Sequence, residues 1–221
     1  KLKRGQRKKY TYDDLKKISY ISLLSVFVIF FWIGFEQAGG SLTLYANSSI
    51  DRTIFGLLIP ASFFQAVNPM IIILLGPFIA KLWLKIDKSN YSISTAKKMG
   101  FGLILLGSGF LLLTFASNSN TIIISFWWLI AVYFLHTLGE LCLSPIGLSM
   151  VTRVSPKKLA SLMMGFWFLS SAVANYMAGK LPLILNSLNI NLFGFLTLTS
   201  FSSGLLLILI APFIEKLINK R

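Results

Sequence analysis

Long apolar stretches alternate with short polar segments along the chain after residue 17. An α-helix rises about 1.5 Å per residue, so about 20 apolar residues are needed to cross roughly 30 Å of hydrocarbon. Each apolar stretch is near or above that length. The pattern therefore predicts six membrane-spanning helices, at about residues 18–45, 55–80, 98–116, 122–150, 158–179 and 191–214.

The first 17 residues differ from the rest of the chain. They hold eight basic and two acidic residues, and they contain no apolar core that could act as a signal sequence. We therefore expect residues 1–17 to form a basic cytoplasmic connector and residues 18–221 to form a six-transmembrane-helix bundle. Because the chain opens on Lys1 rather than Met, we also expect it to be a piece of a longer protein.

The lysines and arginines predict the orientation of the bundle. Nineteen of the 21 fall on one side of the predicted membrane, in segments 1–17, 81–98, 153–158 and 216–221, whereas the other side has only Arg52 and Lys180. Loops rich in Lys and Arg stay in the cytoplasm. Both termini are therefore expected to be cytoplasmic, which requires an even number of spans and agrees with six.

Composition narrows the class of protein. The chain is 55% hydrophobic and only 13% charged, with a mean hydropathy of +0.75, which indicates an all-α membrane protein. The net charge of +14 does not indicate nucleic-acid binding, because the basic residues lie in short segments between spans. The single cysteine, Cys142, excludes an intramolecular disulfide.

Two carboxylates interrupt the apolar helices. Glu36 and Glu140 lie within predicted spans, while the other five acidic residues fall in loops or near an end of the chain. A charged side chain at the centre of a bilayer costs about 2.5–3.5 kcal/mol on insertion scales, so it is rarely present without a function. Each carboxylate belongs to the first helix of a set of three, as expected for an internally duplicated three-plus-three unit.

Helical spacing places further polar residues on common faces. Gln65 and Asn68 are three apart, His136 and Glu140 are four apart, and Trp167 and Ser171 are four apart, with Asn175 following at the same step. Polar stripes on apolar helices face a bundle interior. The third and sixth spans carry only glycines and hydroxyls there, so we expect them to be peripheral and to pack through small residues.

Prolines mark expected breaks in the helices. Asn68-Pro69 is expected to interrupt the second span, and Ser144-Pro145 is expected to break the fourth span just past Glu140. Spanning helices tolerate such breaks where neighbouring helices or a water-filled cavity satisfy the freed carbonyl groups. The breaks lie beside polar residues, which indicates a lined cavity.

Each polar candidate also has a purely structural interpretation. His136 could bond to Glu140 or to a nearby carbonyl, since one histidine beside one glutamate falls short of a metal site. Trp167 and Gln65 could be packing residues, and Asn68 could satisfy the backbone opened by Pro69. Glu36 and Glu140 could form buried hydrogen bonds between helices. The sequence contains no nucleophile with a base and no phosphate loop, so we expect neither an enzyme nor a cofactor.

Four segments together carry a resemblance to a known family. They are FWIGFEQAGGSLTLYA (31–46), ASFFQAVNPMIIILLGPFIAKLW (61–83), LGELCLSPIGLSMVT (138–152) and MMGFWFLSS (163–171). These segments resemble the proton-dependent oligopeptide transporter family of the major facilitator superfamily. The similarity runs from about residue 10 to residue 215 and covers only the C-terminal six-helix half of such a transporter.

The resemblance implies a role for most of the candidates. Glu36 would pair with an arginine of the other half in an outer gate and take part in proton coupling, and Asn68 would contact the peptide backbone. Glu140 would receive the amino terminus of the peptide and exchange partners with a lysine of the N-terminal half. Trp167 and Ser171 match pocket residues. His136 and Gln65 are not assigned by the resemblance, and we expect them to support the site because they share helical faces with Glu140 and Asn68.

The implied function is proton-coupled symport of di- and tripeptides across the cytoplasmic (inner) membrane by alternating access. Its partners would be short peptides, protons, the lipid bilayer and the missing N-terminal six-helix half. The paired glutamates and arginine of the family's first helix have no counterpart here, so this chain alone should not transport. The alternative is a non-transporting membrane subunit or a decayed half-transporter remnant.

Overall fold

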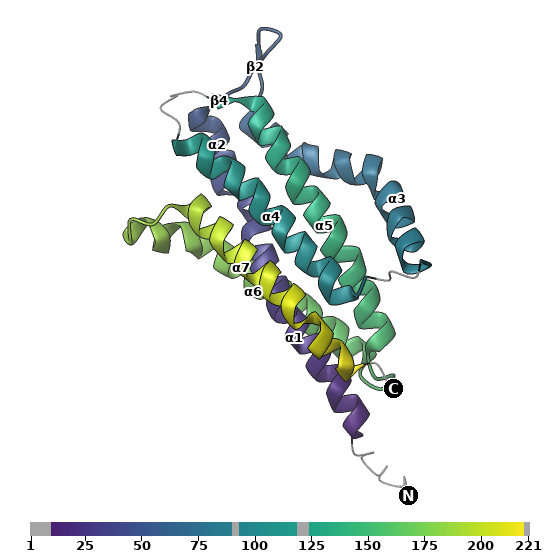
Figure 1. Ribbon diagram of the computed structural model, residues 1–221. Helices are drawn as coiled ribbons and strands as arrows, with labels where there is room; N and C mark the ends of the chain where they lie inside the picture. Colours follow the sequence, from purple (N-terminus) through teal and green to yellow (C-terminus); the bar gives the residue numbers. More distant parts are fainter. Residues whose placement is uncertain (1–9, 90–92, 119–123, 219–221) are drawn as a thin grey trace, which may run out of the picture.

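The computed structural model describes residues 10–89, 93–118 and 124–218. Within these residues, six helical segments are long and apolar enough to cross a membrane, which confirms the all-α, six-span prediction. Figure 1 shows them as a bundle. The main helices are α1 (Tyr12–Phe35), α3 (Val67–Asp87), α4 (Thr95–Asn118), α5 (Phe126–Val154), α6 (Ala160–Ser187) and α7 (Leu192–Ile214).

The first span starts earlier than predicted and is broken toward its C-terminal end. Thr11 and Asp14 form a capping box in which each side chain accepts a hydrogen bond from the other residue's backbone N–H, so α1 begins at Tyr12 within the expected connector. The helix ends at Phe35 and is followed by the short helices η1 (Glu36–Ala38) and α2 (Ser41–Ser49). Gly39 and Gly40 separate these two helices, and the sequence pattern did not predict this break.

The second span starts and ends later than predicted. Short strands β2 (Thr53–Ile54) and β3 (Leu57–Leu58) form a hairpin where the helix was expected to begin. Phe55 and Gly56, between the strands, both have positive φ angles, as a type I′ turn requires. The span then begins with the 3₁₀ helix η2 (Ala61–Ala66) and continues as α3 to Asp87.

Proline has different effects at the two predicted breaks. Pro69 lies in the first turn of α3, where its missing N–H costs no internal hydrogen bond. The predicted break at Ser144-Pro145 is wrong, because α5 continues through Pro145 to Val154. A spanning helix can keep its course at an interior proline when its neighbours support the freed carbonyl.

The third span is not peripheral within this bundle. α4 is the most buried of the six spans and packs closely against α5 on one side and α7 on the other. Small residues allow this approach, as predicted. A Cβ at Gly102 would lie 2.7 Å from the carbonyl oxygen of Gly139 in α5, and one at Gly100 would lie 3.0 Å from that of Gly204 in α7.

The second span stands apart from the other five. No residue of α3 is buried, and its principal helix contact is with α5. Figure 1 shows α3 bending away from the bundle along its length. Pro77 lies inside this helix, and an interior proline removes a backbone hydrogen bond and commonly kinks a helix. The sides of α3 that do not face α5 are therefore uncovered within the described residues.

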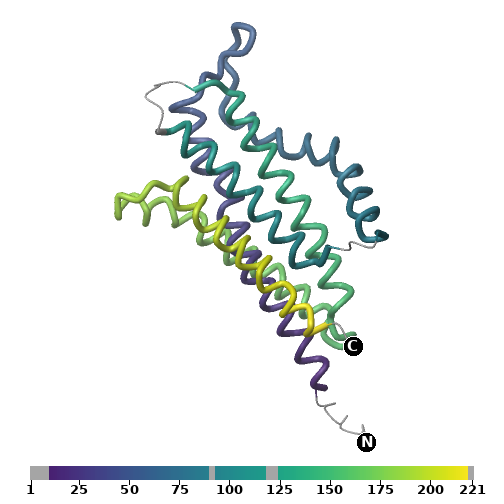
Figure 2. Tube along the Cα trace, viewed as in Figure 1, coloured from purple at the N-terminus to yellow at the C-terminus, as the bar shows by residue number. Residues whose placement is uncertain are grey.

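The start of α1 and the end of α7 lie at the same end of the bundle (Figure 2). At the opposite end, the strand β1 (Ile50–Asp51), which follows α2, pairs in parallel with β4 (Ile124–Ser125), which precedes α5. This pairing joins the C-terminal end of the first span to the N-terminal end of the fourth.

Candidate functional site

An asparagine and a glutamate from different spans meet between α3 and α5. The side-chain amide of Asn68 donates one hydrogen bond of 2.8 Å to Oε2 of Glu140 and another of 3.1 Å to Oγ1 of Thr137. Both Asn68 and Glu140 are half-buried. The amide therefore holds the carboxylate on the side of α5 that faces α3.

Thr137 completes this arrangement. Its hydroxyl donates a 2.6 Å hydrogen bond to the carbonyl of Tyr133 one turn earlier, which leaves an oxygen lone pair free to accept from Asn68. Thr137 and Glu140 are three residues apart and lie on one helical face. The pair thus binds both amide protons of Asn68, and the described residues give Glu140 no salt bridge.

Glu36 lies at the break in the first span. It is the first residue of η1, its side chain is exposed, and it forms no salt bridge within the described residues. Glu36 thus lies in η1, whereas Glu140 lies in α5 and is bound by Asn68.

The sequence analysis missed Gln37, which anchors the same break. Its side chain is only 1% exposed. The amide donates 3.1 Å hydrogen bonds to the carbonyls of Ile33 in α1 and Ala178 in α6, and its oxygen accepts a 2.7 Å bond from Ser41. Gln37 therefore ties the end of α1 to α6 directly beside Glu36. A polar residue two positions before the Gly39-Gly40 pair was the signal that could have revealed it.

Gln65 does not join Asn68, although the two are three residues apart. Its amide donates a 3.0 Å hydrogen bond to Oγ1 of Thr43 in α2. Gln65 lies in the 3₁₀ helix η2, whereas Asn68 lies in α3, so the expected α-helical face does not run continuously through both. Gln65 connects η2 to α2 above the Asn68–Glu140 pair.

His136 also faces a different helix from Glu140. Its ring is 2% exposed and lies 4.6 Å from the ring of Phe110 between centroids, so it packs on α4. A Cβ at Gly109 would approach the ring to 2.5 Å, which only glycine avoids. Among the described residues Nε2 has no hydrogen-bond partner. The geometry thus favours a packing role for His136 over the expected pairing with Glu140.

Trp167 and Ser171 lie on α6, away from the Asn68–Glu140 pair. The Trp167 ring is 5% exposed and sits over Gly147 of α5, where an added Cβ would approach it to 2.4 Å. Ser171 is half-buried one turn further along α6. Trp167 therefore fills the contact between α5 and α6 in this structure.

A cavity of about 890 Å³ lies between α3 and α5. Gly76, Leu141 and Pro145 are among the residues that line it, as are the charged residues Asp87, Lys98, Arg153 and Glu215. Asn68 and Glu140 are not among its lining residues. Within the described residues, no group of His, Cys, Asp and Glu side chains could hold a metal ion.

Comparison with known proteins identifies relatives of this chain. The model of the POT family matches residues 1–199. The peptide transporter YePEPT of Yersinia enterocolitica is 35% identical over 175 residues, which cover 77% of this chain and 34% of the relative. The di-/tripeptide transporter of Lactococcus lactis is 30% identical over 219 residues, which cover 96% of this chain and 44% of the relative.

Solved structures give the same result. The crystal structure of a peptide transporter POT in complex with sulfate superposes with a TM-score of 0.84 at 30% sequence identity. The match covers 97% of this chain and 44% of that one. The chain thus spans less than half the length of these relatives, and it matches that part with one continuous fold.

Proposed function

We propose that this chain, which belongs to the POT family, is the C-terminal half of a proton-coupled symporter of di- and tripeptides. Its six membrane-length spans make it a multi-pass inner-membrane protein. Both termini lie in the cytoplasm in this proposal, as the distribution of lysine and arginine indicates. A major facilitator fold uses two six-helix bundles that rock around a site near the midplane. This chain supplies one of the two bundles.

The hydrogen bond between Asn68 and Glu140 carries the proposal. In this bond the amide of one spanning helix orients a half-buried carboxylate of another, which supports a binding role for both. A peptide has a charged amino terminus and a backbone of amide groups, which a carboxylate and an asparagine can bind together. An ion pair at about 4 Å is worth far more in a low-dielectric cavity than in water. Glu140 receives the amino terminus, and Asn68 contacts the peptide backbone.

Glu36 is the proton-coupling and gating residue of the proposal. It has no salt bridge within the described residues and lies at a helix break, so it is free to pair with an arginine of the other half. Trp167 and Ser171 would line the pocket after the α5–α6 contact opens.

Reconstitution with a second half tests the proposal. The chain would be co-expressed with the N-terminal six-helix half of a POT-family transporter, and the pair would be placed in proteoliposomes with an inward proton gradient. We expect radiolabelled alanyl-alanine to accumulate above equilibrium, and a protonophore should abolish this accumulation. Vesicles with the chain alone should show only leakage. An assembled pair that fails to transport would instead support a non-transporting subunit or a decayed remnant.

A further inference from the structure

One face of α3 changes from apolar to basic along its length. Leu74, Phe78, Lys81, Lys85 and Lys88 follow each other at steps of four and three residues, which keeps them within one helical stripe. The stripe rises about 21 Å from Leu74 to Lys88 at 1.5 Å per residue. Its apolar part lies within the membrane-length span, and its basic part lies at the end of that span.

This stripe points away from the bundle. Gly76, Ala80, Trp83 and Asp87 lie on the opposite face of α3 and line the cavity toward α5. In contrast, Leu74 and Phe78 are 62% and 68% exposed, and no residue of α3 is buried. Nothing in the described part of the chain therefore covers the stripe.

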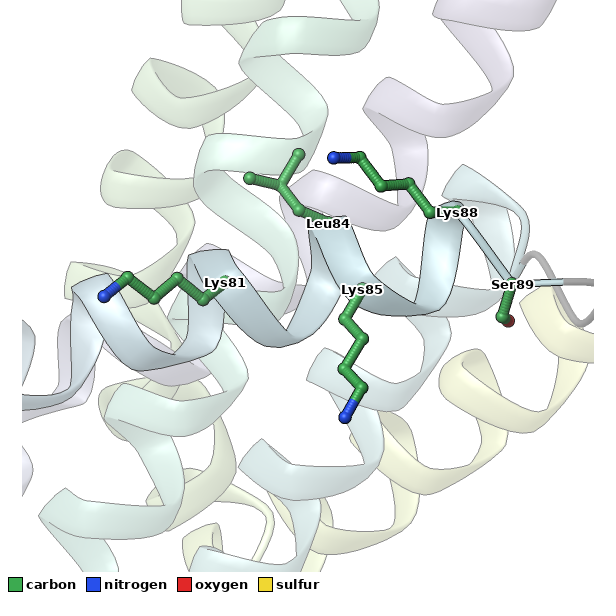
Figure 3. Close-up of a pocket in the computed structure, with 5 residues that line it drawn as sticks. All are labelled: Lys81, Leu84, Lys85, Lys88 and Ser89. Carbon is green, nitrogen blue, oxygen red and sulfur yellow. The ribbon is translucent and has the colours of Figure 1, made fainter.

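The three lysines have no acidic neighbour to neutralise them. Asp87 is the nearest carboxylate in sequence, but it forms a 2.5 Å ion pair with Lys98 of α4. None of Lys81, Lys85 and Lys88 forms a salt bridge within the described residues. Figure 3 shows the three lysines on successive turns of α3, with the Lys85 side chain extended to the opposite side of the helix from Lys88 and Leu84. Together with Leu84 and Ser89 they line an open surface hollow of about 410 Å³.

We propose that this stripe, Leu74 to Lys88, is a binding site for an anionic phospholipid. The lysine ammonium groups bind the headgroup phosphate, and one acyl chain lies along Phe78 and Leu74. The order of apolar and basic residues along the helix matches the order of acyl chain and headgroup in a lipid leaflet. Basic residues at the end of a span attract anionic lipids, and the attraction falls off within a Debye length of the surface. The site does not depend on the transport activity proposed above.

Lipid retention tests the site. The purified chain would be released from vesicles of equal phosphatidylglycerol and phosphatidylcholine, and native mass spectrometry would count the lipids that stay bound. We expect retained phosphatidylglycerol to fall at least fivefold in Lys81→Gln/Lys85→Gln/Lys88→Gln. The control Lys157→Gln/Lys158→Gln/Lys216→Gln removes the same charge elsewhere and should retain phosphatidylglycerol as the unmodified chain does.

A second measurement locates the lipid without any substitution. Acetylation of lysines would be followed residue by residue in vesicles with and without phosphatidylglycerol. We expect the lipid to slow acetylation of Lys81, Lys85 and Lys88 at least threefold, while Lys157 and Lys158 change little. Equal losses in both triple variants, or equal protection of all lysines, would overturn the site in favour of general charge attraction. An unchanged number of retained lipids in the α3 variant would also overturn the site. This face would then be assigned to contact with the other half of the transporter.

Discussion

The side-chain amide of Asn68 in α3 lies 2.8 Å from the carboxylate of Glu140 in α5, although the two residues are 72 positions apart in sequence. This hydrogen bond and the ion pair of Asp87 with Lys98 both tie α3, a helix that has no buried residue, to its neighbours. The hydrogen bond fixes the orientation of Glu140, which is proposed to receive the amino terminus of the peptide. It also attaches the loosely packed α3 to the bundle.

Replacing Glu140 with Gln should weaken peptide binding in the assembled transporter. Glu140→Gln keeps an oxygen for Asn68 but removes the charge that receives an ammonium group. Hydrogen bonds to charged groups are worth about 1.5–3 kcal/mol, so the apparent affinity for alanyl-alanine should fall by about tenfold to a hundredfold. The control is an N-acetylated dipeptide, whose binding should change little. An equal loss for both peptides would contradict the assigned role.

The interaction energy between Asn68 and Glu140 can be measured from the unfolding stability of single and double variants. Asn68→Ala removes the donor from a half-buried carboxylate, and we expect a loss of about 1–3 kcal/mol. Thermal unfolding of the chain in detergent would be measured for Asn68→Ala, Glu140→Ala and the double variant. The double variant should be less destabilised than the sum of the single ones by at least about 0.5 kcal/mol. Strict additivity would show that the hydrogen bond contributes nothing.

Glu36 should be required for coupling but not for movement of the peptide. Glu36→Gln removes the titrating group while retaining a similar side-chain shape. In proteoliposomes with the N-terminal half, proton-driven accumulation of alanyl-alanine should be lost. Counterflow exchange, which needs no net proton movement, should stay within about threefold of the unmodified pair, a difference below 1 kcal/mol. If counterflow failed to the same degree, the proton-coupling role would be wrong.

Gly102→Ala should destabilise the folded chain, whereas Gly179→Ala should not. A Cβ at Gly102 would lie 2.7 Å from a backbone carbonyl of α5, so Gly102→Ala must push α4 and α5 apart and should cost about 1–3 kcal/mol. Gly179 in α6 has open space at the same position. Gly179→Ala should therefore be neutral or stabilising by up to about 1 kcal/mol, through helix propensity. Thermal unfolding of both variants in detergent makes the comparison.

The ion pair between α3 and α4 should respond asymmetrically to the loss of its partners. Lys98 is 6% exposed and also lies 5.0 Å from the centroid of the Trp83 ring, while the side chain of Asp87 is 46% exposed. Asp87→Asn leaves a buried ammonium group unpaired, whereas Lys98→Met leaves a carboxylate that water can solvate. We expect the Asp87 variant to be the less stable one, because an uncompensated buried charge is costly. The opposite ranking of unfolding temperatures would contradict this explanation.

Several features followed from local sequence alone. An apolar stretch forms a span when it is long enough to cross the bilayer. The six spans could therefore be counted from the apolar stretches without a structure. Glu36 and Glu140 stood out for the same reason, since a carboxylate is conspicuous in an apolar stretch. The boundaries of the spans were less predictable, because a capping box at Thr11 and a hairpin at Phe55 decide them through local hydrogen bonds.

Only the tertiary structure decided which side chains meet. His136 and Glu140 are one turn apart, yet His136 packs on α4 and Glu140 is bound by Asn68 of α3. Their directions from α5 differ by only about 40°, at the boundary between two neighbouring helices. Which neighbour each side chain reaches depends on how closely α4 approaches at Gly102 and Gly109. Sequence thus determined what enters the membrane, while helix rotation and packing distance decided the partners of each polar group.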